Sequence, residues 1–142
     1  MKASVILSIF CILALSACSY GHGIRRVLTF ESPVKDISCI AKSLSRQGLE
    51  RPWGDDDGSY EIELEPGYTM SVGFSRARYR DGDNLRTSQN KISHFINFGS
   101  PPAKCSLVNK ARKPMKTVEA IVLADCGWEP IDTEVNKRCT RF

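Results

Sequence analysis

The chain has 142 residues and a formal net charge of +4 at pH 7. This length allows one domain with a modest hydrophobic core and is too short for two comfortable ones. The excess of positive charge is small and does not support nucleic-acid binding.

The N-terminal residues have the layout of an export signal. A lysine precedes an apolar run from Val5 to Leu15, which is too short to cross a bilayer because a spanning helix needs about 20 residues. The run ends in Leu15-Ser16-Ala17-Cys18, which resembles the lipobox of bacterial lipoproteins. The resemblance implies cleavage before Cys18, a diacylglyceryl thioether on its sulfur and acylation of the new amine.

Lipidation at Cys18 predicts the compartment of the chain. Several acyl chains exceed the roughly two signals that stable anchoring requires, so the protein should stay on its membrane. Ser19 stands where an Asp resembles an inner-membrane retention signal, which favours the outer membrane. We expect a signal peptide over residues 1–17, a flexible lipidated tether over 18–26 and a single domain over 27–142 that faces the periplasm.

The first half of the domain predicts a strand, a helix and a hairpin. Residues 27–30 are a strand candidate, and Ser32-Pro33 has the composition of a helix start. Apolar residues at helical spacing then predict a helix that ends at Gly48. That apolar face comprises Val34, Ile37, Ile40, Ala41 and Leu44. Residues 51–59 are expected to form a loop, and residues 60–65 and 69–75 alternate as two strands joined by Pro66-Gly67.

The second half of the domain has weaker patterns. The polar stretch 76–91 is predicted to be a long loop with a turn at 81–84, and residues 92–98 resume strand alternation. Residues 105–108 are a candidate edge strand, and Pro114 begins a segment whose helical face ends at Gly127. A strand remains open for residues 115–125 because several are β-branched, but helix is favoured. Residues 128–142 are expected to be a patternless tail attached through Cys139.

These elements predict an α+β fold. An antiparallel sheet of three to five strands would carry two helices on one face, as a two-layer sandwich. On the second strand Glu61, Glu63 and Glu65 would point into water.

Two of the six cysteines fall in the signal peptide and at the lipidation position, which leaves four in the domain. An even number of cysteines in a small exported domain indicates two disulfides. No closely spaced pair such as C-x2-C occurs, which argues against zinc. Four cysteines allow three pairings. Cys39 falls off the apolar face of its helix and Cys126 lies at the edge of the second helix's apolar face, so we favour Cys39 with Cys126 and Cys105 with Cys139.

The sequence has few groups in a catalytic pattern. His22 falls in the tether, and His94 alternates with apolar residues on a strand, where a packed or rim histidine is commoner than a catalytic one. The acidic run 55–57 departs from the spacing of a calcium-binding loop. We therefore expect no enzyme activity, no metal and no cofactor.

The hypothesis that remains is a lipid-anchored binding protein whose partner is another envelope protein. Exposed arginine and aromatic side chains on loops have the composition of interface anchors. The candidates for contact with the partner are Trp53, Arg76, Arg78, Tyr79 and Arg80. A narrower form is an immunity protein or inhibitor of a toxin or hydrolase that acts in the periplasm. The alternative is a structural or assembly lipoprotein of a secretion system or of the outer membrane.

Overall fold

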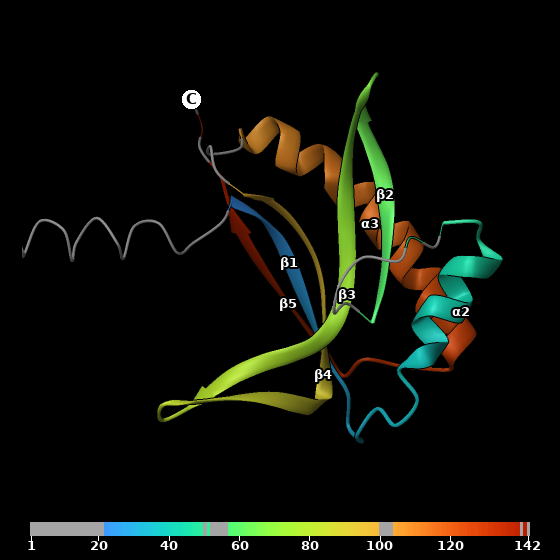
Figure 1. The fold of residues 1–142 in the computed structure, drawn as a ribbon, viewed down its shortest axis with the longest axis vertical. Coiled ribbons are helices and arrows are strands. Elements are labelled where there is room, and N and C mark those ends of the chain that lie inside the picture. The colour runs from blue at the N-terminus through green and yellow to red at the C-terminus, as the bar shows by residue number, and fades with distance from the viewer. Residues whose placement is uncertain (1–21, 50, 52–56, 100–103, 140, 142) are drawn as a thin grey trace, which may run out of the picture.

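The structure is a computed structural model that describes residues 22–49, 51, 57–99, 104–139 and 141. The chain folds as β1 (His22–Thr29), α2 (Ser38–Arg46), β2 (Gly58–Glu65), β3 (Tyr68–Asp81), β4 (Asn84–Gly99), α3 (Cys105–Cys126) and β5 (Asp132–Arg138). The strands form one antiparallel five-stranded sheet in the order β2-β3-β4-β1-β5. Helices α2 and α3 lie on one side of this sheet (Figure 1). The predicted two-layer α+β sandwich is confirmed.

Strand register directs one set of side chains towards the helices. Ile24 of β1 pairs with Ile96 of β4, and Leu28 pairs with Ile92. On the neighbouring pair, Phe74 of β3 lies opposite His94. Burying a large apolar side chain of this kind stabilises a fold by about 1.5–3 kcal/mol. The helices close the core with Ile40, Leu44, Val108, Ala111, Met115, Val118 and Val122.

The predicted β2–β3 hairpin is confirmed. Tyr60, Ile62 and Leu64 are buried, whereas the glutamates at positions 61, 63 and 65 are exposed. The turn between the strands contains Gly67, whose φ of 77° favours glycine.

Two disulfides fasten the helical layer, with the predicted pairing. Cys39–Cys126 joins α2 to the end of α3, and Cys105–Cys139 joins the start of α3 to the residue that follows β5. Disulfides of this kind typically stabilise a small domain by about 2–4 kcal/mol each.

The predictions for residues 18–48 need two corrections. Strand β1 begins at His22, so residues 22–26 belong to the sheet and not to a flexible tether; Ile24 and Arg26 of this segment are buried. Helix α2 begins at Ser38, later than the Ser32-Pro33 start predicted for it. The cause is hydrogen bonding, because Phe30 N–H and Val34 N–H donate to Asn90 and Gln89 of β4 and hold the chain extended.

The predicted loop over residues 76–91 is wrong except for its central turn. Strands β3 and β4 continue through it and are joined at Gly82 and Asp83. The register shifts after Arg76, and beyond it the hairpin bends away from the side of the sheet that carries the helices (Figure 1). We call residues 77–90 the arm. Most of its residues are exposed, so its sequence lacks the apolar alternation from which strands are predicted.

The C-terminal predictions are corrected in three places. Residues 105–108 form the first turn of α3 and not an edge strand, and Pro114 lies inside this helix. Residues 115–125 are helical, as favoured. The expected tail contains β5, an edge strand whose residues are all exposed and which pairs with β1. Neither described helix has the length and apolarity needed to cross a bilayer.

Candidate functional site

Four polar side chains meet inside the core, between the centre of the sheet and α3. Arg26 donates to both carboxylate oxygens of Glu119 from Nε and Nη2, at 2.8 and 2.9 Å. His94 Nδ1 lies 2.8 Å from Glu119 Oε2, and His94 Nε2 lies 2.8 Å from the Tyr60 hydroxyl. We call Tyr60, His94, Glu119 and Arg26 the buried network.

Adjacent strands and one helix position this network. Arg26 and His94 are direct partners in the β1–β4 register, and Tyr60 projects from β2 on the same face. Glu119 shares the inner face of α3 with Met115, Val118 and Val122. The His94 ring stacks on Phe74 with a centroid separation of 4.0 Å, which fixes its orientation.

Electrostatics define the protonation of the network. Burial lowers the pKa of His94 and outweighs the hydrogen bond and charge of Glu119, so the imidazole is neutral near pH 7. Burial raises the pKa of Glu119, but hydrogen bonds from His94 and Arg26 outweigh it and leave the carboxyl ionised. A carboxylate only accepts, so His94 Nδ1–H donates to Glu119 and Nε2 accepts the Tyr60 O–H.

The order carboxylate, imidazole, hydroxyl has the form of an activated nucleophile, but the surroundings oppose that chemistry here. Tyr60 and His94 are each 0% exposed. Burial and the charge of Glu119 raise the pKa of Tyr60, whereas an activated hydroxyl needs a lowered one. The network therefore satisfies buried polar groups and orients the core.

Sequence reasoning missed Arg26 and Glu119, although the sequence carries a signal for both. Arg26 stands between Ile24 and Leu28 in a strand period, and Glu119 lies among buried positions of a helical period. Opposite charges at two positions expected to be apolar indicate a buried ion pair.

The predicted contact residues fall into three groups. Arg78, Tyr79 and Arg80 lie together on the exposed arm. Arg76 lies at the base of the arm, where its guanidinium donates to Val34 O and Gln89 O. Trp53, like the lipidation candidate Cys18, lies outside the described residues.

The base of the arm is held by hydrogen bonds from both sides. Besides the Arg76 guanidinium, the Arg76 N–H donates to the carboxylate of Asp57, and Asn90 Nδ2 donates to Phe30 O. Asp57 belongs to the end of the acidic run weighed as a calcium ligand, and here it accepts from the backbone. The arm thus leaves the sheet from a fixed point.

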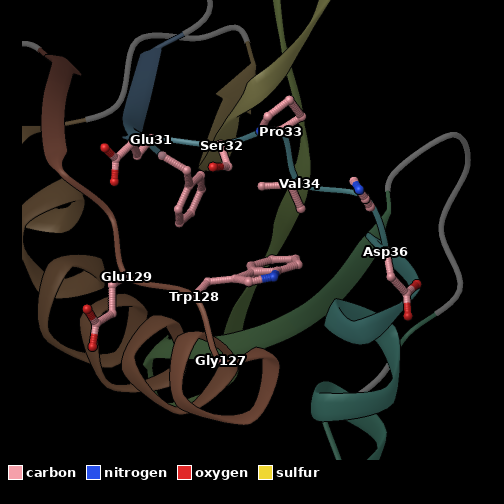
Figure 2. Close-up of a pocket in the computed structure, with 10 residues that line it drawn as sticks. Glu31, Ser32, Pro33, Val34, Asp36, Gly127, Trp128 and Glu129 are labelled. Atoms are coloured by element: carbon pink, nitrogen blue, oxygen red, sulfur yellow. The ribbon is translucent and has the colours of Figure 1, made fainter.

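A pocket of about 440 Å³ lies beside Trp128, whose ring meets Phe30 edge-on at a centroid distance of 5.8 Å. Figure 2 shows the indole below Val34, with the carboxylates of Glu31 and Glu129 pointing outward. Asp36 accepts from Ser38 at the start of α2. The acidic groups do not converge on a common point, so this pocket has no evident binding centre.

No group of side chains suited to holding a metal ion occurs within the described residues. Comparison of the chain with family models, curated proteins and solved structures found no match. The arm exposes aromatic and arginine side chains and is held at its base by hydrogen bonds. We take it as the candidate functional site.

The buried network gives a stability prediction. Glu119→Ala leaves the Arg26 guanidinium buried without its partner, so we expect the free energy of unfolding to fall by about 3–5 kcal/mol. Urea denaturation monitored by circular dichroism measures this. Glu65→Ala is the matched control, since it removes an exposed pair with Lys110 and should cost less than about 1 kcal/mol. Equal losses in both variants would show that the network contributes no more than a surface pair.

The network also predicts that acid destabilises the fold. The pKa of His94 is lowered from 6.5, so below that pH the unfolded chain binds a proton that the folded chain does not. The pKa of Glu119 is lowered from 4.5, which adds a second loss at lower pH. The free energy of unfolding should fall by up to about 1.4 kcal/mol per pH unit as the pH drops below 6.5. Denaturation of wild type and His94→Gln from pH 7 to 5 checks this, because the variant should lose that slope; parallel curves contradict it.

Proposed function

We propose that this chain is a lipid-anchored protein of the bacterial cell envelope, attached through Cys18 to the outer membrane and facing the periplasm, and that it binds another envelope protein through the arm. The observation that carries the binding role is the arm, which stands clear of the core and exposes aromatic, aliphatic and cationic side chains. The lipobox resemblance supports the anchor. Two disulfides fit an oxidising compartment.

The composition of the arm suits a protein interface. Tyr79 is 51% exposed and Leu85 is 64% exposed, so neither stabilises the core. The register places Tyr79 opposite Arg86 and Leu85 opposite Arg80, so an arginine accompanies each apolar group. Tyrosine and arginine are enriched among the residues that dominate binding energy.

The fixed base suits binding as well. An isolated two-stranded hairpin is marginally stable in water, and ordering one on binding would weaken a complex. The hydrogen bonds of Arg76 and Asn90 hold this hairpin before any partner arrives. The arm can therefore bind without a large ordering cost.

The narrower proposal is an immunity protein or inhibitor. A projecting, preordered hairpin has the shape to enter a cleft such as the active site of a toxin or hydrolase in the periplasm. The chain's own Tyr60, His94 and Glu119 are enclosed in the core, which supports binding over catalysis. This step is an analogy with small disulfide-stapled lipoproteins as a class.

Strand β5 favours a second candidate, a structural or assembly lipoprotein of a secretion system or of the outer membrane. All residues of β5 are exposed and it forms one edge of the sheet, where a strand of another protein could add. A neighbouring gene for an exported effector would favour inhibition. A neighbouring cluster for an envelope complex would favour assembly.

Lipidation is tested by growing producing cells with labelled palmitate. We expect label on the wild-type chain and none on Cys18→Ala, because the thioether forms on the sulfur of Cys18 and the acylated amine is the one that cleavage before the lipidated residue exposes. An unlabelled wild-type chain would refute the anchor and the compartment inferred from it.

The binding role predicts that Tyr79→Ala weakens the complex by about 2 kcal/mol, or roughly 30-fold in Kd. The full chain in nonionic detergent would capture its partner from solubilised envelopes, and calorimetry with the purified partner would give the affinity. Tyr68→Ala is the matched control, since Tyr68 is 41% exposed at the opposite end of β3.

The outcomes of this experiment separate the candidates. Weakening by Tyr79→Ala alone supports the arm, and equal affinities in both variants remove it. Loss of a captured hydrolase's activity in a one-to-one complex supports inhibition. Recovery of a large membrane assembly, with affinity unchanged by Tyr79→Ala, supports the assembly role.

A further inference from the structure

A groove of about 510 Å³ lies between the arm and the side of the sheet that faces away from the helices. Its floor includes Val27 and Ser93, which are direct partners in the β1–β4 register and alternate with core residues. Tyr79 contributes to its wall. Ser93 is only 6% exposed although neither α2 nor α3 covers this face. The arm, which bends over this face, therefore forms the wall of the groove and shields its floor.

Among the residues that the structure describes, three cations line this groove and no carboxylate does. They are Arg25 and Lys91 from the sheet and Arg78 from the arm. The salt bridges of the described residues involve none of the three. Most cations on a folded surface have solvent around them, but these three are gathered around one concave space, so their fields add there.

The geometry of Arg25 prepares it for a ligand. Its guanidinium lies over the ring of Phe95, 5.7 Å from the centroid. A guanidinium in contact with an aromatic ring can still donate two parallel hydrogen bonds to a carboxylate. Ordering Arg25 beforehand reduces the entropy lost when the ligand binds.

The carboxylates that strand β5 places on the same face lie outside the lining of the groove. Strand β5 presents Asp132 and Glu134 beyond β1, opposite Thr29 and Val27. Glu134 accepts a hydrogen bond from Asn136, and neither carboxylate lines the groove. An anionic group in the groove would therefore meet three cations.

We propose that this groove binds an acidic segment of the partner protein, whose aspartate or glutamate side chains pair with Arg25, Arg78 and Lys91. This deepens the proposed function and rests on it, since it gives the chemistry of what the arm's partner presents. The volume suits a few residues of peptide. The recessed shape disfavours a bilayer, because the arm would hold a flat surface of head groups away from the floor.

The test is a titration of the full chain in nonionic detergent with a fluorescent oligo-glutamate peptide. We expect binding that weakens as salt rises and that falls at least tenfold in the double variant Arg25→Glu, Lys91→Glu. The charge-matched control is Arg112→Glu, Lys116→Glu, which reverses two exposed cations on α3, in the other layer. This control should bind as wild type does.

Either of two other results would refute the proposal that the groove binds an acidic segment. Absence of peptide binding, or equal loss in the control variant, would show that the three cations form no specific site. Binding of short-chain phosphatidylglycerol that competes with the peptide and is tighter than it would assign the groove to lipid head groups.

The two proposals fail separately. Arg80 and Leu85 belong to the arm but do not line the groove. A partner whose affinity drops with Arg80→Ala or Leu85→Ala, while the oligo-glutamate peptide does not bind, would retain the arm and remove the acidic ligand.

Discussion

The fold depends on the burial of one carboxylate. Glu119 is ionised and buried between α3 and the sheet, where a charge lowers the stability of the fold unless other groups compensate it. Arg26 compensates the charge with two hydrogen bonds and His94 adds a third. Because these donors come from two adjacent strands, β1, β4 and α3 must keep their relative positions. Burial keeps His94 neutral, and its hydrogen bond to Glu119 through Nδ1 leaves Nε2 to accept from the Tyr60 hydroxyl.

Covalent bonds and hydrogen bonds complete this scaffold at its margins. The disulfides fasten both ends of α3, one to α2 and the other beyond β5, so the helical layer cannot slide over the sheet. On the sheet, Arg76, Asn90 and Asp57 fix the point at which the arm departs. The stabilising contacts and the proposed binding surface are thus separated in space: the buried side chains hold the fold, and the arm, through which we propose that a partner binds, is exposed.

Local sequence patterns predicted part of the fold but only part of the candidate site. The β2–β3 hairpin was predictable because Tyr60, Ile62 and Leu64 alternate with exposed glutamates, so one face of the strand is dry. The arm was not predictable as strands, because both of its faces are wet and its polar residues show no period. The arginines and Tyr79 on it were identified from composition alone. The groove cations Arg25 and Lys91 were not, because they are far apart in the chain and meet only through strand pairing and the bend.

The sequence by itself determined the α+β class, the existence of two helices, the central hairpin and a disulfide pairing in agreement with the structure, since each depends on periodicity or on cysteine number and placement. Tertiary structure alone decided the start of α2, the length of α3 and the existence of β5. Residues 32–34, predicted to begin the first helix, are instead held extended by the hydrogen bonds that Phe30 and Val34 donate to β4, and β5 forms a strand because it pairs with β1. The buried network also belongs to the tertiary structure, because a charge at an apolar position is tolerated only when a residue distant in sequence supplies its partner.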